Sequence, residues 1–339
     1  MKQIAFCTIY REYWNDLFFN EDACNIGENL LLPNILLRKR WRAMGYMCHT
    51  ADICDRDQIK AYIFFDIPNS SIYTIRGIKS VLAYVVKRKW RNDYLLQARR
   101  HHIPCNLVVD EPPVIRPLSY MTKYYKYFDR VFTWNDDLVD GKKVMKFYMP
   151  QIYTKQDYHV QFEQKKLLTL IASNKSSSEK NELYSQRRNV IEYLESNAAG
   201  CFDFYGVGWE NSGYHNYQGK IAEKIKTLSR YRFCICFENM EKINGYVTEK
   251  IFDCFFAQCV PVYWGAGNIQ DILPKDTYID YRDFGSIQSV MDYIQKMDIN
   301  TYNAMLQNIR NYLNSSRFQE TFDVNHYVSL LTEHCEVLS

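Results

Sequence analysis

Short apolar segments alternate with amphipathic segments in two successive series, and this alternation constrains the fold more than any other feature of the sequence. The strands predicted in the first series are 2–9, 61–65, 106–109 and 130–133. Helices are predicted between them at 28–44 and 75–101, because apolar residues recur there at helical spacing. Strands that are separated by helices are typical of a parallel sheet in an α/β fold.

A second α/β series follows a polar, aperiodic stretch at 151–166. Its predicted strands are 167–171, 202–205, 233–237, 259–263 and 278–280, and its predicted helices are 189–196, 221–229 and 249–257. The 339 residues suffice for two compact domains. We therefore predict an N-terminal lobe at 1–155, a C-terminal lobe at 156–320, and a last segment, 321–339, whose helix packs back on the first lobe. Two Rossmann-like lobes that face a central cleft would bind ligands at the carboxyl ends of their strands.

Composition and spacing argue against several other classes of protein. The longest apolar runs, including 81–86 and 259–264, are far shorter than the ~18 to 20 residues of a membrane span, so we expect none. The first residues show no signal-peptide cleavage pattern. The eleven cysteines are scattered without a CxxC pair, which favours small core residues in a reducing compartment over zinc binding or a disulfide framework. A net charge of +3 is too small to indicate nucleic-acid binding by itself.

One helix N-terminus in the second series carries most of the functional information. The helix follows a strand that ends in Glu238-Asn239 and then a polar loop, and Thr248 is its expected N-cap. Glu249 and Lys250 stand in its first turn. The free N–H groups and the dipole of a helix N-terminus favour a negative charge, and an adjacent lysine adds a compact cation that suits a diphosphate. Glu249 is either a structural residue favoured by the dipole or an acceptor of hydrogen bonds from sugar hydroxyls.

The sequence around this helix contains a longer pattern of four segments. They are Glu238-Asn239, Gly245-Tyr246-Val247-Thr248-Glu249-Lys250, Val260-Pro261-Val262-Tyr263-Trp264-Gly265 and Asp280-Tyr281-Arg282-Asp283-Phe284. The pattern resembles the donor-binding signature of the α-1,3/4-fucosyltransferase family, and a weaker likeness extends from about residue 167 to 284. Members of that family use GDP-fucose and have the two-lobed GT-B fold. The resemblance therefore implies a GT-B architecture, with the acceptor on the N-terminal lobe and GDP-fucose on the C-terminal lobe.

The resemblance also implies which residues contact the donor. The contacts that it implies are Glu238, Asn239, Tyr246, Glu249 and Lys250. It further implies an arginine that helps to hold the diphosphate, at the start of the helix after Asn174. Arg187 and Arg188 compete for this role, and counting back from Leu194 favours Arg187. The alternative for either arginine is a solvated helix face.

A general base for the acceptor hydroxyl is expected in the N-terminal lobe. The best-placed carboxylates follow the strand 106–109, in Asp110-Glu111-Pro112-Pro113, where the prolines end the strand and hold a carboxylate at the edge of the sheet. The resemblance implies a glutamate in an equivalent setting as the base, and Glu111 matches it. Asp110 is the competitor, but adjacent strand residues point to opposite faces. The alternative is a loop carboxylate without a catalytic role.

The implied reaction is a single inverting displacement in which Glu111 takes the acceptor proton as the bond to GDP lengthens. It requires no cofactor and no metal ion. Residues 55–57, Asp-Arg-Asp, have the DxD spacing of metal-dependent glycosyltransferases, but they precede an apolar strand instead of following one, so we expect a solvated loop. Asp136 and Asp137 are expected in a surface turn.

Two basic stretches, 38–42 and 87–102, lie on predicted helices of the N-terminal lobe. Such stretches are usually solvated helix faces, and the alternative is a weak attraction to an anionic membrane or an acidic glycan. Trp41 and Trp90 lie among the basic residues, but no OB, RRM or KH pattern accompanies them, so we expect no nucleic-acid partner. The aromatic residues that either pack in the core or stack on acceptor sugars are Tyr10, Tyr13, Trp14 and Tyr120.

Together these observations predict a soluble, bacterial-type α-1,3-fucosyltransferase. The expected acceptor is the 3-hydroxyl of N-acetylglucosamine or glucose in an N-acetyllactosamine-like glycan or a lipopolysaccharide O-antigen. The expected location is the cytoplasm, with peripheral attachment to the inner face of the cell membrane as an option. The alternatives are a GT-B transferase that uses GDP-mannose or a UDP-sugar, and a non-catalytic glycan- or nucleic-acid-binding protein on the same fold.

Overall fold

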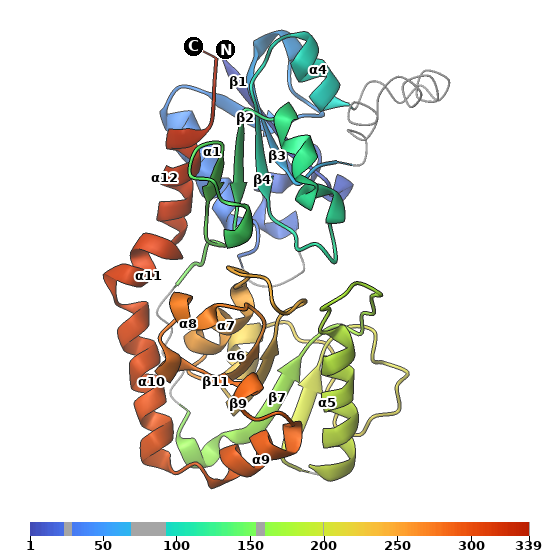
Figure 1. Ribbon diagram of the computed structural model, residues 1–339, viewed down its shortest axis with the longest axis vertical. Coiled ribbons are helices and arrows are strands. Elements are labelled where there is room, and N and C mark those ends of the chain that lie inside the picture. Colours follow the sequence, from blue (N-terminus) through green and yellow to red (C-terminus); the bar gives the residue numbers. More distant parts are fainter. Residues whose placement is uncertain (24–28, 69–92, 154–159, 199, 339) are drawn as a thin grey trace. The chain divides into compact units, whose positions relative to one another are not determined.

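The computed structural model describes residues 1–23, 29–68, 93–153, 160–198 and 200–338. The chain forms two compact units, one of Met1–Pro150 with Val324–Ser339 and the other of Gln151–Asp323. Each unit contains its own parallel sheet with helices around it (Figure 1). Most of the predicted helix 75–101 lies outside the described residues, and so does the basic stretch around Trp90.

The sheet of the first unit has six parallel strands in the order β2-β1-β3-β4-β5-β6. The strands are β1 (Gln3–Thr8), β2 (Met47–Thr50), β3 (Ile59–Phe65), β4 (Cys105–Val109), β5 (Arg130–Thr133) and β6 (Val144–Lys146). The sequence analysis missed β2 and β6, which are the two edge strands. Both are short and contain half-buried residues, so their apolar signal is weak.

The helices of the first unit are α1 (Leu32–Ala43), α4 (Tyr94–Arg100) and α12 (Val324–His334). α1 begins later than predicted because Pro33 stands in its first turn, where the missing N–H is not needed. α12 packs against α1, and the rings of Tyr327 and Phe147 lie 5.7 Å apart. Beyond α12, the Leu338 N–H donates a 3.0 Å hydrogen bond to the Lys60 carbonyl, and the Met1 ammonium donates a 3.1 Å hydrogen bond to the Gln58 Oε1. Both chain ends therefore contact the start of β3 (Figure 1).

The sheet of the second unit has five parallel strands in the order β11-β10-β9-β7-β8. The strands are β7 (Lys166–Ile171), β8 (Phe202–Tyr205), β9 (Tyr231–Phe237), β10 (Val260–Trp264) and β11 (Ile279–Asp280). β9 is central and mostly buried, and its last residue, Phe237, pairs with Trp264. Because all five strands are parallel, the residues that follow β7, β9 and β10 meet at one edge of the sheet.

The helices of the second unit are α5 (Tyr184–Asn197), α6 (Lys224–Leu228), α7 (Glu249–Phe256), α8 (Ile269–Ile272), α9 (Ile287–Lys296), α10 (Ile299–Leu313) and α11 (Ser316–Thr321). α5 begins several residues before its predicted start. Its N-terminus is held by a tertiary contact, since the Leu183 N–H donates a 2.9 Å hydrogen bond to the Asn239 carbonyl. α7 matches its prediction closely because Ile251, Phe252 and Phe255 form a buried stripe at helical spacing. Within the described residues, no helix is long and apolar enough to span a membrane.

Candidate active site

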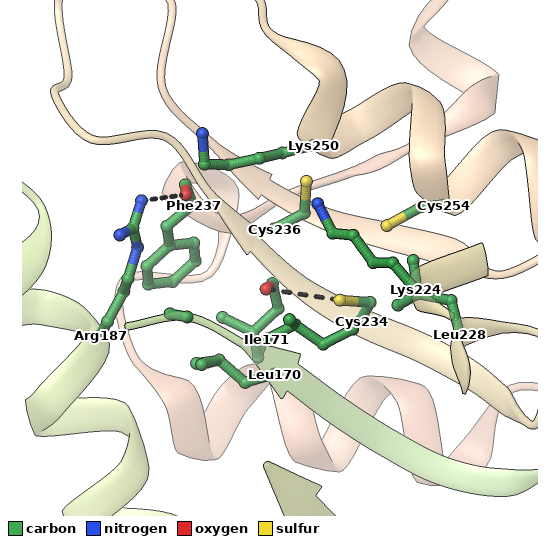
Figure 2. Close-up of a pocket in the computed structure, with 12 residues that line it drawn as sticks. Leu170, Ile171, Arg187, Lys224, Leu228, Cys234, Cys236, Phe237, Lys250 and Cys254 are labelled. Atoms are coloured by element: carbon green, nitrogen blue, oxygen red, sulfur yellow. Dashed lines mark hydrogen bonds between the residues drawn. The ribbon is translucent and has the colours of Figure 1, made fainter. Parts of the chain in front are cut away.

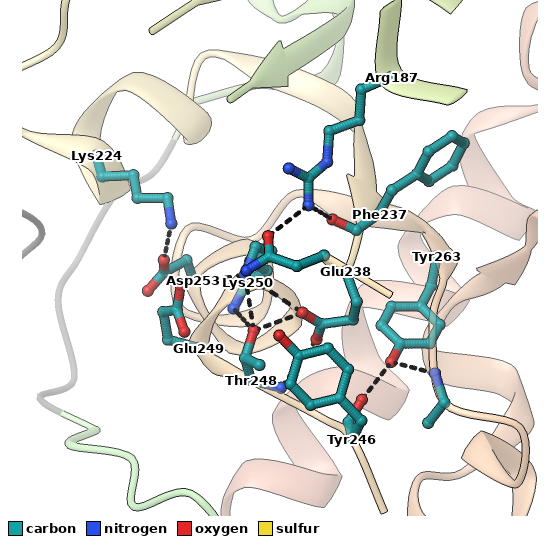
Figure 3. A network of polar contacts seen from close by, with 12 residues as sticks. Arg187, Lys224, Phe237, Glu238, Tyr246, Thr248, Glu249, Lys250, Asp253 and Tyr263 are labelled. Carbon is teal, nitrogen blue, oxygen red and sulfur yellow. Dashed lines mark hydrogen bonds and ion pairs between the residues drawn. The ribbon is translucent and has the colours of Figure 1, made fainter. Parts of the chain in front are cut away.

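Glu238 follows β9, and its side chain is completely buried. Its Oε1 accepts a 2.9 Å hydrogen bond from the Thr248 N–H, and its Oε2 accepts a 2.7 Å hydrogen bond from the Thr248 hydroxyl. The Lys250 Nζ lies 3.3 Å from Oε2 (Figure 3). A buried carboxylate with these partners is shielded from any ligand. In this structure the Glu238 carboxylate positions the start of α7, and the donor contact implied for it stays a prediction.

Thr248 is the N-cap of α7, which confirms that prediction. Its backbone is extended, and its hydroxyl accepts a 3.4 Å hydrogen bond from the Lys250 N–H. The Lys250 Nζ donates to the same hydroxyl over 3.2 Å and lies 3.6 Å from the Glu249 Oε1. The Glu249 side chain is 52% exposed, while Lys250 is largely buried. The first turn of α7 thus presents a positive end with one accessible carboxylate beside it.

Arg187 joins α5 to the end of β9. Its Nη2 donates a 2.6 Å hydrogen bond to the Phe237 carbonyl and a 3.0 Å hydrogen bond to the Asn239 Oδ1. The guanidinium also lies 5.3 Å from the centre of the Tyr184 ring. Burial lowers the pKa of Arg187, and the charge of Glu238 opposes that shift. This cation is therefore held rigidly next to Asn239, which the resemblance assigns to the donor.

Arg188 belongs to a different set of contacts. Its Nη2 donates a 2.8 Å hydrogen bond to the Lys175 carbonyl, away from the residues around Lys250. Of the two competing arginines, the structure brings only Arg187 together with Glu238 and Lys250. The structure thus favours Arg187 for this role, and the donor contact of either arginine stays a prediction.

A small cavity of about 20 Å³ lies at the carboxyl ends of β7 and β9 (Figure 2). Three cationic side chains line it, Arg187 from α5, Lys224 from α6 and Lys250 from α7. The thiols of Cys234 and Cys254 are part of its apolar wall. Its volume has room for a water molecule but not for a phosphate chain. A bound diphosphate would therefore lie over the cations and not inside the cavity.

Lys224 and Asp253 form an ion pair that the sequence analysis missed. The Lys224 Nζ lies 2.5 Å from the Asp253 Oδ2. Burial raises the pKa of Asp253 to about 6. The positive charge of Lys224 opposes this shift, and the negative charge of Glu249 adds to it. Burial alone would raise the pKa of Glu249, but the charges of Lys250 and Lys224 outweigh it and lower that pKa to about 2. The four-residue spacing of Glu249 and Asp253 places both on one helix face, but no local pattern identifies Lys224 as the partner.

Tyr246 belongs to the framework of the site. Its side chain is 1% exposed, and its carbonyl accepts a 3.2 Å hydrogen bond from the Tyr263 hydroxyl (Figure 3). The Tyr263 hydroxyl in turn accepts a 3.1 Å hydrogen bond from the Ala266 N–H. The ring of Tyr246 is buried in this structure, and its contact with the donor stays a prediction. Asn239 is half buried, and it remains a candidate donor contact together with Glu249 and Lys250.

Gly265 follows β10 and allows Glu238 to pack beneath it. A Cβ at this position would lie 2.4 Å from the Glu238 Cγ and 2.5 Å from the Tyr263 hydroxyl, so no other residue fits without a shift. The Gly265 carbonyl also accepts a 3.0 Å hydrogen bond from the Lys242 N–H. This contact ties the loop between Asn239 and α7 to the end of β10.

Glu111 lies in the first unit, directly after β4 and Asp110. The Tyr10 hydroxyl donates a short hydrogen bond to the Glu111 Oε1. The Glu111 N–H donates a 3.0 Å hydrogen bond to the Asp66 Oδ2, and the Tyr120 hydroxyl donates a 2.8 Å hydrogen bond to the Glu111 carbonyl. Glu111 is half buried and held by contacts from three other segments, whereas Asp110 is exposed.

Asp66 is a further residue of this group that the sequence analysis missed. It follows β3, is 1% exposed and adopts a left-handed backbone with φ of 61°. Burial raises the pKa of Asp66 well above its usual range, and the charge of Asp110 adds to the shift. A single carboxylate after an apolar strand carries no local signal for this contact with Glu111, which is 45 residues away.

The other motifs take structural roles in the described part of the chain. Asp55 accepts a 3.2 Å hydrogen bond from the Asp57 N–H and caps a short 3-10 helix, so residues 55–57 form the exposed turn that was predicted. Asp136 lies 2.5 Å from the Lys146 Nζ. Trp41 is 2% exposed and belongs to the core. No cluster of three or more metal-ligating side chains occurs among the described residues.

The region that contains the donor-side residues matches a known family. Residues 161–338 match the family model described as glycosyltransferase family 10 (fucosyltransferase), C-term, and this stretch is more than half of the chain. The chain belongs to glycosyltransferase family 10. Arg187 and the whole segment from Glu238 to Asp253 lie inside the match.

Curated relatives of this family 10 protein are similar over shorter stretches. The alpha-(1,3)-fucosyltransferase FucT of Helicobacter pylori is 31% identical over 141 residues, which cover 41% of this chain and 26% of the relative. An alpha-(1,4)-fucosyltransferase of Arabidopsis thaliana is 36% identical over 84 residues, which cover 24% of this chain and 21% of the relative. The chain thus matches about a quarter of the length of these relatives.

Solved structures show the same fold. A crystal structure of alpha1,3-fucosyltransferase with GDP aligns with a TM-score of 0.52 and 15% identity over 94% of this chain and 89% of that one. An alpha-glucosyltransferase in complex with UDP-glucose and DNA aligns with a TM-score of 0.57 and 10% identity over 98% of this chain and 99% of that one. These alignments confirm the predicted GT-B fold class of two parallel α/β sheets.

Proposed function

We propose that this family 10 protein transfers L-fucose from GDP-fucose to a hydroxyl of a glycan acceptor. The observation that carries the proposal is the convergence of Lys250, Arg187 and the N-terminus of α7 at the carboxyl end of β9, inside the family match. The fold of a solved alpha1,3-fucosyltransferase with GDP-fucose, which aligns with a TM-score of 0.51, agrees with it.

On the donor side, the leaving diphosphate gains negative charge as the bond to fucose breaks. The Lys250 ammonium, the N–H groups in the first turn of α7 and the Arg187 guanidinium supply positive charge without reorganisation. Glu249 is accessible beside Lys250 and accepts hydrogen bonds from sugar hydroxyls. Because these groups already offset the diphosphate charge, we propose that the reaction needs no divalent cation. Turnover that survives excess EDTA would support this, and turnover that requires added magnesium or manganese would contradict it.

On the acceptor side, Glu111 is the proposed general base. It removes the proton from the acceptor hydroxyl while that oxygen attacks the anomeric carbon of fucose. The bond between this carbon and the β-phosphate oxygen breaks, GDP leaves, and the configuration inverts. The hydrogen bonds from Tyr10, Tyr120 and the backbone hold Glu111 at the edge of its sheet. The proposed acceptor is the 3-hydroxyl of N-acetylglucosamine or glucose in an N-acetyllactosamine-like glycan or a lipopolysaccharide O-antigen.

The decisive experiment measures GDP release from GDP-fucose with N-acetyllactosamine, together with GDP binding by calorimetry. Lys250→Ala is expected to weaken GDP binding by about 10- to 100-fold, since it removes a charge-assisted contact. Lys226→Ala is the matched control, because Lys226 is exposed on α6 and pairs with Glu223. Tighter binding of UDP than of GDP would identify a different donor. No nucleotide binding and no turnover with any acceptor would contradict the proposal.

We also propose weak peripheral attachment to an anionic membrane, at the cytoplasmic face. Three basic residues of α1 are exposed, Lys39, Arg40 and Arg42, while Arg38 is paired with Asp16. Near an anionic surface each exposed basic residue contributes about 1 kcal/mol. Cosedimentation with phosphatidylglycerol vesicles, but not with phosphatidylcholine vesicles, is the expected result, and equal cosedimentation would contradict it.

A further inference from the structure

The first unit contains a pocket of about 370 Å³ beside Glu111. It lies at the carboxyl ends of β1 and β3, and the residues after β4 form its other wall. Tyr10 and Trp14 contribute aromatic rings to it, and Arg11 and Arg116 contribute guanidinium groups. None of its described lining residues is an aspartate or a glutamate. The size is in the range of small-ligand sites, and the charge of the lining is positive.

Arg116 is held in place by two hydrogen bonds to backbone carbonyls; burial lowers its pKa, and the charges of Asp66 and Glu111 oppose that shift. Its Nη2 donates a 2.6 Å hydrogen bond to the Ile67 carbonyl, and its own N–H donates a 2.9 Å hydrogen bond to the Pro112 carbonyl. Its Nε is buried and has no hydrogen-bond partner among the described residues. Arg38 and Arg130 of the same unit each pair with a carboxylate, whereas Arg116 forms no ion pair with any described residue. A half-buried guanidinium in this state is available to an anion.

Arg11 and Trp14 form the second part of the pocket. The Arg11 guanidinium lies 5.6 Å from the centre of the Trp14 ring, and Arg11 likewise forms no ion pair with a described residue. The Tyr10 ring lies 6.0 Å from that of Tyr13 in an edge-on arrangement, and the Tyr10 hydroxyl reaches Glu111. An aromatic face next to an arginine suits a sugar ring that carries a negative charge. Through Tyr10, the same pocket adjoins the carboxylate proposed as the base.

We propose that this pocket is an acceptor subsite for an acidic saccharide, whose anionic group pairs with Arg116 and Arg11 while its ring lies against Trp14. The proposal rests on the proposed function only in placing the accepting hydroxyl next to Glu111. A carboxylate and a sulfate ester share the required chemistry, because the planar fork of a guanidinium binds two oxygens of either group.

The test compares binding of two disaccharides to the full chain in the absence of donor. One is N-acetyllactosamine. The other contains galacturonic acid in place of galactose, so the two disaccharides differ only at C6 of that sugar, where a carboxylate replaces the hydroxymethyl group. The acidic disaccharide is expected to bind about tenfold tighter at low salt, and the difference should shrink as salt is raised. A third probe, N-acetyllactosamine with a 6-sulfate on its N-acetylglucosamine, distinguishes a sulfate ester from a carboxylate. Equal affinity for neutral and charged disaccharides would overturn the proposal.

Variants assign the preference to the two arginines. Arg116→Gln is expected to abolish it and Arg11→Gln to reduce it severalfold, whereas Arg230→Gln, which removes an exposed arginine of the second unit, should leave it unchanged. If Arg116→Gln does not fold, Arg116→Lys keeps the charge but loses the fork, and it should lower the preference severalfold. An acidic preference that survives both the Arg11 and Arg116 changes would refute the assignment. Acidic binding without fucose transfer would disprove the proposed function alone, whereas transfer to acceptors without acidic preference would disprove this subsite alone.

Discussion

Replacing Glu238 by glutamine is the sharpest test of how the donor-side residues are organised. The carboxylate accepts two hydrogen bonds from Thr248 and lies 3.3 Å from the Lys250 Nζ, and it is completely buried. Glutamine keeps the shape and one acceptor oxygen, but it removes the charge that offsets Lys250 and Arg187. Removing one partner from a buried charged group costs about 3 kcal/mol of unfolding free energy. For a unit of this size that is a fall in Tm of about 6 to 12 °C.

The assay is thermal unfolding of the full chain by circular dichroism, with Glu249→Gln as the matched control. Glu249 is the neighbouring acid at the same helix end, but its side chain is 52% exposed, so its loss should change the unfolding free energy by about 0.5 kcal/mol or less. The two variants should differ in the property that they lose: Glu238→Gln should mainly lower stability, and Glu249→Gln should mainly lower GDP-fucose affinity. Glu249→Gln should weaken donor binding with little loss of stability, because Glu249 is the accessible acid.

A double-mutant cycle with Thr248→Val separates a positioning role from a direct one. Thr248→Val alone removes the cap and should cost about 1 kcal/mol. Because Thr248 and Glu238 share both hydrogen bonds, the double variant should lose clearly less than the sum of the single losses. Additive losses, or a Tm shift below about 2 °C for Glu238→Gln, would refute the buried network described here.

Three further outcomes follow from the same geometry. Glu111→Gln should retain GDP binding and lower kcat by at least about 100-fold, as expected for loss of a general base, and normal turnover would exclude Glu111 from that role. Gly265→Ala should destabilise the protein by about 2 kcal/mol or more, because the new Cβ collides with Glu238, and an unchanged urea midpoint would contradict this. Asp253, whose pKa is raised to about 6, is ionised and paired with Lys224 above that pH and protonated below it. Protonation of Asp253 releases the charge of Lys224, so GDP affinity should improve as pH falls through 6, and it should improve more in the wild type than in Asp253→Asn. Protonation of GDP itself affects both proteins equally. Identical pH profiles of the two proteins would contradict the assignment.

The elements that the sequence predicted best are those with a strong local signal. β5 and β8 match their predicted bounds: β5 contains the buried residues Val131, Phe132 and Thr133, and β8 alternates between buried and half-buried residues. The start of α5 was predicted too late, because a contact between Leu183 and Asn239 holds its first turn and no local cap announces it. The edge strands β2 and β6 were missed because both are short and no more than half of the residues in either strand are buried.

The same distinction between local signals and tertiary contacts holds for the residues of the candidate active site. The N-cap Thr248 and the first-turn pair Glu249 and Lys250 were predictable, because capping and helix geometry depend on residues that are adjacent in the chain. Whether Glu238 faces a ligand or the interior was not, since Glu238 and Asn239 follow one another and only packing buries the first. For Arg187 and Arg188, helical spacing from Leu194 favoured Arg187, and the structure places Arg187 on Asn239 and Arg188 on Lys175.

By itself, the sequence therefore determined the α/β class, the position of the donor signature and the helix N-terminus that carries its positive charge. Only the tertiary structure decided that Lys224 pairs with Asp253, that Asp66 and Tyr10 hold Glu111, and that Arg11 and Arg116 share one pocket. The physical reason is the separation along the chain between the residues that interact. Helix caps and strand periodicity arise from neighbouring residues, whereas the partner of a buried charge is chosen by which distant segments pack against it.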